Sequence, residues 1–335
     1  MLYKRIPVCI TKREVAFNQD VKAIIVNNKI LPKYLLYWLL ANEPQLLNIV
    51  EPTGIGAGKL TTDVLSKIEV KIPPLAEQRK IAEILGSWDA ALALLDRRIA
   101  AAEQRKRGLM QRLLTGRVRF PEFEGEAWRE VRILDMGKVI TGNTPSKSHD
   151  EFYSGKFPWA SPADMNGPEI LYTKNTLTQS GKKIARIVPK GSVLITCIGS
   201  IGKNAMAGTN LAFNQQINAI VTNGKFDNTF VYYLIDHQPH KLQKYSGTTS
   251  VPIVNKSTFE RIKYLVPPSI DEQRHIAAVL DACDREIALL RRKREALAKQ
   301  KRGLMQRLLT GEVRPPLSPP FGSPPGGESY EETAG

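Results

Sequence analysis

Apolar residues recur at alternating steps of three and four in two long stretches of the chain. The first stretch runs from about Glu77 to Thr115, and the second lies within residues 269–311. This spacing is typical of an amphipathic helix with a heptad seam. Pro73-Pro74 precede the first stretch and Gly116 follows it, as expected at a helix start and a helix end. We therefore predict two helices, each of roughly 35–40 residues or about 50–60 Å.

The apolar stripe of each helix needs a partner, because water would otherwise cover it. Packing on the helix's own globular region is one solution. The simpler one is an intramolecular antiparallel coiled coil, with a globular region at each end. Lys106 and Lys301 interrupt the seam, and polar seam residues can set the register. The expected coiled-coil and partner interface is Leu85, Leu92, Leu95, Ile99, Leu109, Leu113, Leu280, Ile287, Leu290, Leu297, Leu304 and Leu308.

The chain contains two copies of one module. The eleven residues Lys106–Gly116 recur unchanged at Lys301–Gly311, 195 positions later. Three more blocks recur in the same order. Ala16–Gln19 recurs as Ala212–Gln215, and Ile81–Leu85 recurs as Ile276–Leu280. Between them, Pro73-Pro74 with Glu77-Gln78-Arg79 recurs as Pro267-Pro268 with Glu272-Gln273-Arg274. The period is too long for a solenoid. It indicates a duplicated unit in which a variable region precedes a conserved helix.

The variable regions mix the two kinds of pattern, so the predicted fold class is α+β. In the second copy, Val188–Thr196, Ile217–Thr222 and Lys263–Val266 predict strands, whereas Phe230–Leu242 and Ser257–Ile262 predict helices. In the first copy, Ala23–Val26 and Ile68–Ile72 predict strands and Pro32–Leu40 predicts a helix. Met1 aligns with Cys197 at the repeat offset. We therefore expect a half-domain there, with apolar surface that it cannot bury.

These patterns predict five segments. They are the rear half of a first globular domain (1–74), a first conserved helix (75–116), a complete second domain (117–268), a second conserved helix (269–311) and a disordered tail (312–335). The tail is rich in Pro, Gly and Ser, a composition that does not support a packed core.

Composition narrows the class of protein. The formal net charge is +15, which favours a polyanionic partner such as nucleic acid, although a soluble protein with a basic surface remains the alternative. The three cysteines, Cys9, Cys197 and Cys283, show no CxxC spacing and suggest neither a disulfide framework nor a zinc site. We find no signal peptide and no apolar run long enough to span a membrane. The expected location is the cytoplasm.

Polar loops are the candidate DNA-binding sites. We expect Thr144, Ser146 and Lys147 in one loop, Ser200, Lys203 and Asn204 in a second, Thr248 and Thr249 in a third, and Lys59 in the first copy's counterpart of the third. Hydroxyl and amide side chains can read bases, whereas lysines mostly contact phosphates. The glycine-rich loops do not fit the phosphate-loop pattern, and no catalytic or metal-binding residues are identified.

The repeated motifs resemble those of the specificity subunits of type I restriction–modification systems. They are Ile72-Pro-Pro-Leu-Ala-Glu-Gln-Arg79, Val266-Pro-Pro-Ser-Ile-Asp-Glu-Gln-Arg274, both Leu-Leu-Thr-Gly helix ends, Gly142-Asn-Thr-Pro-Ser146 and Pro158-Trp159. The resemblance covers residues 1 to about 314 and departs from the family in the shortened first domain.

The resemblance implies a non-catalytic subunit that reads a bipartite site in double-stranded DNA. It also implies that the helix pair sets the spacing of the half-sites. Two methyltransferase subunits and restriction subunits would dock on it, and these partners would bind S-adenosylmethionine, ATP and magnesium. Two alternatives stay open: a truncated, inactive or recombination-donor copy, and a coiled-coil adaptor without DNA recognition.

Overall fold

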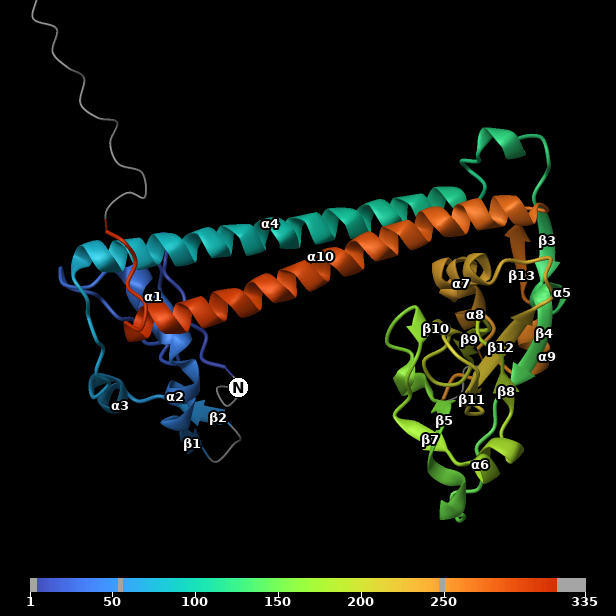
Figure 1. The fold of residues 1–335 in the computed structure, drawn as a ribbon, viewed down its shortest axis with the longest axis horizontal. Helices are drawn as coiled ribbons and strands as arrows, with labels where there is room; N and C mark the ends of the chain where they lie inside the picture. Colours follow the sequence, from blue (N-terminus) through green and yellow to red (C-terminus); the bar gives the residue numbers. More distant parts are fainter. Residues whose placement is uncertain (1–4, 54–56, 247–250, 318–335) are drawn as a thin grey trace, which may run out of the picture. The chain divides into compact units, whose positions relative to one another are not determined.

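The computed structural model describes residues 5–53, 57–246 and 251–317. The chain divides into a first unit, Met1–Ile99 with Leu289–Gly335, and a second unit, Ala100–Ala288. Figure 1 labels their elements. The α-helices are α1 (Pro32–Ala41), α2 (Glu43–Asn48), α3 (Thr62–Ser66), α4 (Leu75–Leu113), α5 (Ile133–Met136), α6 (Gln179–Ile184), α7 (Asn228–His237), α8 (Pro239–Gln243), α9 (Lys256–Arg261) and α10 (Ile270–Thr310). Three short 3-10 helices are η1 (Pro121–Phe123), η2 (Asp150–Phe152) and η3 (Pro162–Asp164).

The strands lie mostly in the second unit. They are β1 (Glu51–Thr53), β2 (Ala57–Lys59), β3 (Arg129–Arg132), β4 (Gly137–Thr141), β5 (Tyr153–Ala160), β6 (Glu169–Ile170), β7 (Asn175–Leu177), β8 (Ile187–Val188), β9 (Val193–Thr196), β10 (Asn204–Ala207), β11 (Leu211–Phe213), β12 (Ile217–Thr222) and β13 (Lys263–Val266). With the helices, they confirm the predicted α+β class.

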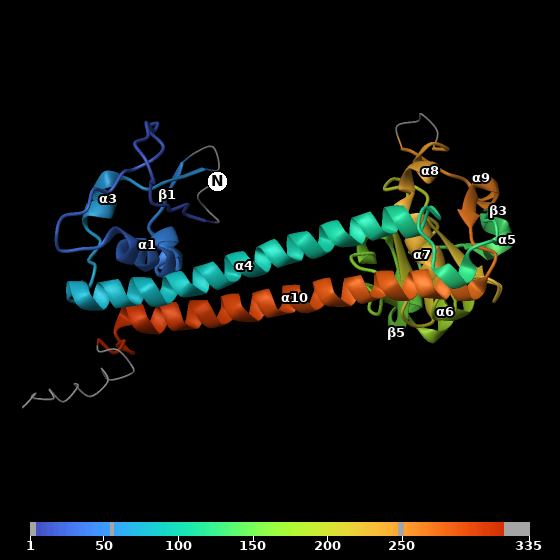
Figure 2. The same ribbon diagram turned by 90° about the horizontal axis from the view of Figure 1, so that it is seen from above.

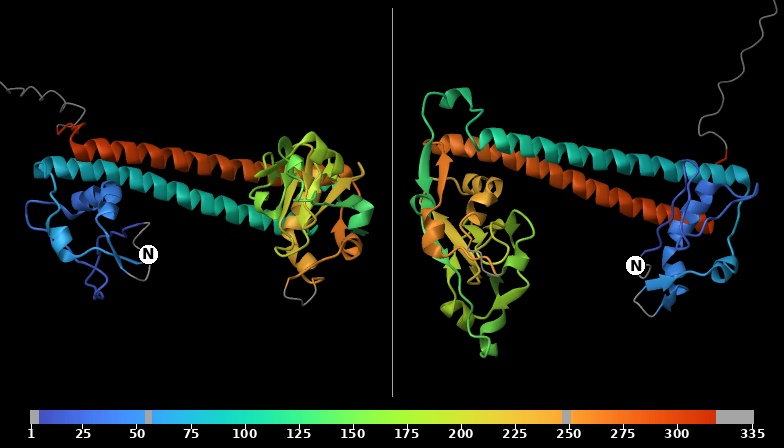
Figure 3. Two further views of the ribbon diagram at one scale, coloured as in Figure 1. Left: turned by 90° about the horizontal axis from the view of Figure 1, so that it is seen from below. Right: turned by 180° about the vertical axis from the view of Figure 1, so that it is seen from behind.

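The two long helices α4 and α10 form where the heptad pattern predicts them. They contain 39 and 41 residues. Gly116 and Gly311 follow them with φ of 70° and 80°, the left-handed conformation in which many helices end. Within each unit the two helices run antiparallel, side by side (Figures 2 and 3). Ion pairs that join them include Asp89–Lys301 and Asp96–Arg294 in the first unit and Lys106–Asp284 and Arg105–Glu286 in the second. The predicted antiparallel pairing is therefore confirmed.

The predicted seam residues face the interior, and none of the twelve is exposed. Leu85, Leu95, Leu113, Leu280, Ile287 and Leu308 are buried, whereas Leu92, Ile99, Leu109, Leu290, Leu297 and Leu304 are half-buried. The apolar face of each helix is wider than a two-residue seam, because Met110, Leu114 and Leu309 are buried as well. This extra width lets each helix pack on a globular region besides its partner helix.

The second unit is built on a five-stranded sheet of order β4-β12-β9-β10-β6. Alternate residues of β9 belong to different cores, as expected of a strand buried on both faces. Val193 and Ile195 lie in the cluster with Phe230 of α7, whereas Leu194 lies in the cluster with Phe213 of β11. A four-stranded sheet, β7-β5-β11-β8, and the pair β13-β3 complete the unit. The helix predicted over Phe230–Leu242 is in fact two, since Pro239 begins α8.

The first unit contains α1, α2, α3 and the hairpin β1–β2. Tyr34, Tyr37 and Trp38 of α1 form a core with Ile81 and Leu85 of α4 and with α10. The strand predictions for Ala23–Val26 and Ile68–Ile72 are wrong, because neither segment forms a strand here. Their counterparts in the second unit are β12, which pairs with β4 and β9, and β13, which pairs with β3. A strand requires a ladder partner, and the described first unit supplies none to these segments.

Candidate nucleic-acid interface

Three polar loops leave the central sheet of the second unit at the same end. The register places Thr141, the last residue of β4, opposite Asn218, and Thr196, the last residue of β9, opposite Ile217. Because β12 begins at Ile217, the loops 142–148, 197–203 and 214–216 all emerge there. Two of the loops that the sequence singled out are thereby brought together.

The first loop is held close to the start of β12. A Cβ atom at Gly142 would lie 2.2 Å from the carbonyl oxygen of Asn214, so only glycine fits this approach. The Thr144 hydroxyl donates a hydrogen bond to Oε1 of Gln215. The hydroxyls of Ser146 and Ser148 lie 2.7 Å apart, and Lys147 is exposed beside them. The loop thus offers hydroxyls and one cation to solvent.

The second loop is a tight connection between β9 and β10. Gly199 has a φ of 75°, and its N–H donates to the carbonyl oxygen of Pro252 at 3.0 Å. The Thr196 hydroxyl donates to the carbonyl oxygen of Ser200. Ser200 and Lys203 are exposed, and Nζ of Lys203 donates to the carbonyl oxygen of Pro162 at 3.2 Å.

A hollow of about 390 Å³ lies beside this loop. Its lining is Gly199, Ser200, Ile201, Lys203, Gln243, Ser246 and Pro252. The second loop therefore lies next to the region where the third loop was predicted.

The remaining candidate residues lie in different surroundings. Asn204 is buried, and its amide donates to the carbonyl oxygen of Tyr232 at 2.9 Å. It therefore holds β10 to α7 and has no route to a base edge, which removes it from the candidate interface. Thr248 and Thr249 lie outside the described residues. Lys59 is exposed at the end of β2 in the first unit.

Two glutamines at this end of the sheet were missed by the sequence reasoning. Gln215 receives the Thr144 hydrogen bond, and Gln243 lines the hollow. Amide side chains can pair with the edge of adenine. A signal existed for Gln215, since it lies in the repeated block Ala212–Gln215.

A buried glutamine anchors each globular region to the start of its long helix. In the second unit, Gln273 Nε2 donates to the carbonyl oxygens of Pro267 and Lys225 at 3.2 and 3.5 Å, and its Oε1 accepts from the Asp227 N–H at 2.9 Å. Gln78 is its repeat counterpart in the first unit. It makes the equivalent bonds to Pro73, Lys29 and Leu31 at 2.8, 2.9 and 2.8 Å. Three backbone segments therefore converge on each glutamine.

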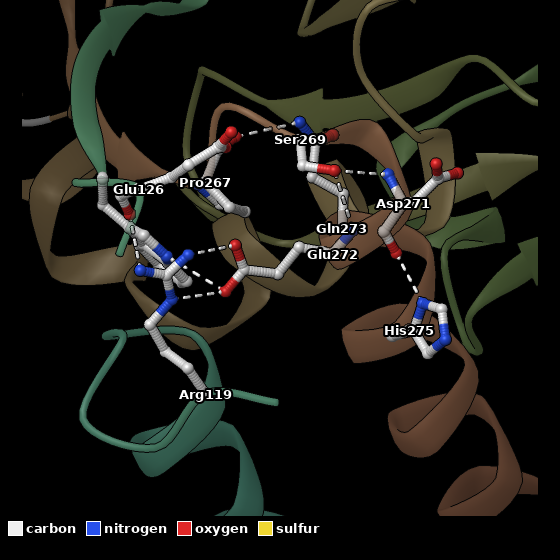
Figure 4. Close-up of polar contacts among 9 residues, drawn as sticks. Arg119, Glu126, Pro267, Ser269, Asp271, Glu272, Gln273 and His275 are labelled. Atoms are coloured by element: carbon white, nitrogen blue, oxygen red, sulfur yellow. Dashed lines mark hydrogen bonds and ion pairs between the residues drawn. The ribbon is translucent and has the colours of Figure 1, made fainter. Parts of the chain in front are cut away.

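An ion pair lies next to this glutamine in the second unit (Figure 4). Nε and Nη2 of Arg119 lie 2.8 and 2.7 Å from the two carboxylate oxygens of Glu272. Nε1 of Trp128 donates to the same carboxylate at 3.2 Å. The Glu272 side chain is fully buried, so its charge depends on these donors. This contact ties the chain that follows α4 to the first turn of α10.

A tyrosine, an aspartate and a lysine join α7 of the second unit to both long helices. In the second unit, the Tyr233 hydroxyl of α7 donates to Asp284 at 2.7 Å. Nζ of Lys106 lies 2.7 Å from both Asp284 carboxylate oxygens and 5.0 Å from the centre of the Tyr233 ring. Burial and the hydrogen bond to Asp284 raise the pKa of Tyr233. The hydroxyl therefore stays protonated and acts as a donor.

Metal binding and membrane insertion find no support in the described residues. No group of three His, Cys, Asp or Glu side chains gathers closely enough there to hold a metal ion. None of the helices in that part of the chain combines the length and the apolar character of a membrane span.

Comparison with known proteins places the chain in a family. Residues 6–104 and 125–299 match the model described as type I restriction modification DNA specificity domain. The putative type I restriction enzyme MjaX specificity subunit of Methanocaldococcus jannaschii is 28% identical over 306 residues, covering 86% of this chain and 69% of the relative. The type I restriction enzyme EcoR124I/EcoR124II specificity subunit of Escherichia coli is 25% identical over 276 residues, which cover 77% of this chain and 64% of that relative.

A solved structure has the same fold. It is the crystal structure of the type I restriction-modification system S subunit from M. genitalium, with a TM-score of 0.58 and 15% identity over 84% of this chain and 73% of that one. The family match extends over most of the chain and includes both copies of the repeat. The protein therefore belongs to the family of type I restriction–modification DNA specificity domains.

Proposed function

We propose that this chain is the DNA-reading subunit of a type I restriction–modification complex, and that residues 117–268 read one half-site. The observation that carries the proposal is the convergence of polar loops at one end of the β4-β12-β9 sheet. Thr144, Gln215 and Ser200 offer hydrogen-bonding groups there, and Lys147 and Lys203 offer charge for phosphates. The net charge of +15 supports a polyanionic ligand.

We also propose that the paired helices set the spacing of two half-sites and carry the partner subunits. Each long helix carries one copy of the same exposed surface. Leu94 is 52% exposed on α4, and its repeat counterpart Leu289 is 67% exposed on α10. Arg97 and Arg292 follow them at the same spacing. Two copies of one surface suit two copies of one partner. The partners are methyltransferase subunits, with restriction subunits joining them. Methyl transfer and cleavage, with S-adenosylmethionine, ATP and magnesium, belong to those partners.

Residues 1–74 correspond in our proposal to the rear half of a first recognition domain. The support is the alignment of Ala16–Gln19 with Ala212–Gln215 and of α1 with α7. In the second module, residues 117–196 form the corresponding front half. Recognition of a second half-site requires such a front half as well.

Co-expression with a cognate methyltransferase subunit tests the function. We expect methylated adenines at sites that share at least the half-site read by residues 117–268. Exchange of residues 117–268 for the corresponding region of another family member should change that half-site and leave complex assembly intact. A folded complex without sequence-specific methylation would favour an inactive or donor copy. A chain without salt-dependent affinity for duplex DNA would favour a coiled-coil adaptor.

A further inference from the structure

Arg186 lies at the end of the second unit where the polar loops emerge. It stands in the short segment between α6 and β8 (Figure 1). The register places Ile187 of β8 opposite Ala212 of β11, so Arg186 is next to the end of β11 that leads into the loop 214–216. Its side chain is exposed. An exposed cation that was not among the predicted site residues therefore borders the candidate interface.

Asn143 of the first loop fixes the backbone of this segment. Its Oδ1 accepts a hydrogen bond from the Arg186 N–H at 2.7 Å, and its Nδ2 donates to the Ile184 carbonyl oxygen at 3.1 Å. Its own N–H donates to the Phe213 carbonyl oxygen at 2.9 Å, and its carbonyl oxygen accepts from Nε1 of Trp159 at 3.1 Å. One asparagine thus ties the Arg186 segment to the first loop, to the end of β11 and to β5.

The Arg186 side chain is held as well. Its Nη1 donates to the carbonyl oxygen of Thr141, the last residue of β4, at 2.9 Å. The parallel N–H groups on Nε and Nη2 have the geometry that bidentate recognition requires. Other arginines of the second unit pair with carboxylates, namely Arg119, Arg132, Arg274 and Arg285. Arg186 is held by an amide and a carbonyl oxygen, which fix its position without neutralising its charge.

We propose that Arg186 is a specificity-determining residue that reads a guanine in the half-site recognised by residues 117–268. The inference rests on the function proposed above and deepens it by naming one base contact. Arginine bidentate to O6 and N7 of guanine is the commonest base-specific contact in the major groove. The contact costs less conformational entropy when the guanidinium is already fixed, as it is here at the backbone and at the side chain. Phosphate contact needs charge alone, and the exposed Lys147 and Lys183 supply it on the two segments that Asn143 joins.

The test uses the full chain in complex with a cognate methyltransferase subunit. Methylated sites first define the half-site, in which we expect a guanine. Binding is then measured to duplexes in which each guanine of the half-site is replaced in turn by 7-deazaguanine, a base that lacks the N7 acceptor. At one position, we expect the replacement to weaken binding by the unaltered chain about 10-fold, because a hydrogen bond to a charged donor is lost. The same replacement should leave binding by Arg186→Ala unchanged.

Lys183→Ala is the matched control. It removes an exposed cation from the neighbouring helix α6 but should keep the full penalty for 7-deazaguanine. Arg186→Lys is a second variant, which keeps the charge and lacks the planar fork of donors. It should lose most of the penalty while the dependence of affinity on salt concentration stays the same. Sequence preference at the other half-site positions shows that each variant is folded.

Three outcomes overturn the contact. The first is a half-site without guanine. The second is an equal penalty for 7-deazaguanine in the unaltered chain and in both Arg186 variants, which makes another group the reader. The third is an equal loss of affinity for every sequence in Arg186→Ala, with a smaller salt dependence, which makes Arg186 a phosphate contact. A complex of the unaltered chain with no sequence preference contradicts the proposed function itself, whereas the three outcomes above contradict this contact alone.

Discussion

Lys106 and Lys301, 195 positions apart, occupy equivalent places against an aspartate on the opposite helix. Nζ of Lys106 lies 2.7 Å from Asp284, and Nζ of Lys301 lies 2.5 Å from Asp89. Each ammonium also lies over a tyrosine ring, at 5.0 and 5.1 Å from its centre. The same three-residue cluster therefore forms once in each unit. Each lysine that interrupts the apolar seam therefore pairs with the opposite helix.

Removal of the Lys106 charge should destabilise the second unit. In Lys106→Met, the half-buried Asp284 keeps only the Tyr233 hydroxyl, and we expect a loss of about 1–3 kcal/mol. The double variant Lys106→Asp with Asp284→Lys should recover part of that loss. Urea unfolding of each variant measures the effect. The control is Arg105→Ala, whose exposed pair with Glu286 should contribute less than about 1 kcal/mol. Equal effects of the two single substitutions would contradict this view of the cluster.

Substitution of Gln273, the glutamine anchor of the second unit, should lower the stability of that unit more than substitution of Lys106. Gln273→Leu leaves the Asp227 N–H and two carbonyl oxygens without their partner, and we expect a loss of about 2–4 kcal/mol. Gln273→Glu should cost more, because it buries a charge beside the Pro267 and Lys225 carbonyl oxygens. Thermal unfolding is the measurement, and Gln300→Leu on the exposed face of α10 is the control. An unchanged midpoint in Gln273→Leu would show that the anchor is dispensable.

Cysteine chemistry should separate the three thiols. Cys9 is exposed, whereas Cys197 and Cys283 are buried. Burial raises the pKa of Cys197 from its ordinary value of 9.0 to about 12. A thiol reagent at pH 8 should therefore modify Cys9 alone in the native protein and all three cysteines in denaturant. The Cys197 thiol ionises at a lower pH in the unfolded chain than in the folded protein. Its contribution to the free energy of unfolding is therefore complete below pH 9 and is lost as the pH rises towards 12. Rapid native labelling of Cys197 would contradict the burial.

A lysine substitution in the second loop tests whether that loop contacts DNA phosphates, and a second exposed lysine provides a matched control. Lys203 lies at the loop end of the β4-β12-β9 sheet, and Lys225 is exposed just after β12, at the opposite end. Lys203→Ala should weaken DNA binding across sequences. It should also reduce the slope of log affinity against log salt concentration by about one, because one phosphate contact is lost. Lys225→Ala should leave the slope unchanged. Binding of the full chain across salt concentrations distinguishes the two, and equal slopes for both variants would remove the second loop from the interface.

Lengthening both helices should lengthen the recognised site. One heptad inserted after Arg98 in α4 and another after Arg291 in α10 keeps the facing residues in register. Each heptad adds about 10 Å, or roughly three base pairs. The methylation pattern of a complex with two complete recognition domains measures the gap between half-sites. An unchanged gap would mean that the helices do not set the spacing.

The long helices were predictable because their pattern is local. Heptad spacing, the Pro73-Pro74 boundary and the glycine ends all act within one segment, and α4 and α10 begin and end within two residues of the prediction. The absence of strands at 23–26 and 68–72 was not predictable, because a strand depends on partners elsewhere in the chain. Their residues include β-branched side chains that favour strands, as Ile220 and Val221 of β12 do, but no ladder partner is present in the described first unit.

The candidate site was predictable only in outline. Loops 142–148 and 197–203 stood out by glycine and polar content, and the sheet register brings their ends together. Burial of Asn204 could not be read from its neighbours, because the carbonyl oxygen that it contacts belongs to Tyr232, 28 positions away. Likewise, Gln273 and Gln78 look like ordinary helix residues in sequence, and only the fold shows the three backbone groups that each one binds.

The glutamine anchors have a consequence for how such proteins acquire new target sites. Each anchor bonds to main-chain atoms, at Lys225, Asp227 and Pro267 in one module and at Lys29, Leu31 and Pro73 in the other. Main-chain atoms are the same whatever side chains surround them. We therefore expect a different globular region to fit between two anchors without redesign of the joint, provided that its main chain presents the same groups to the glutamine.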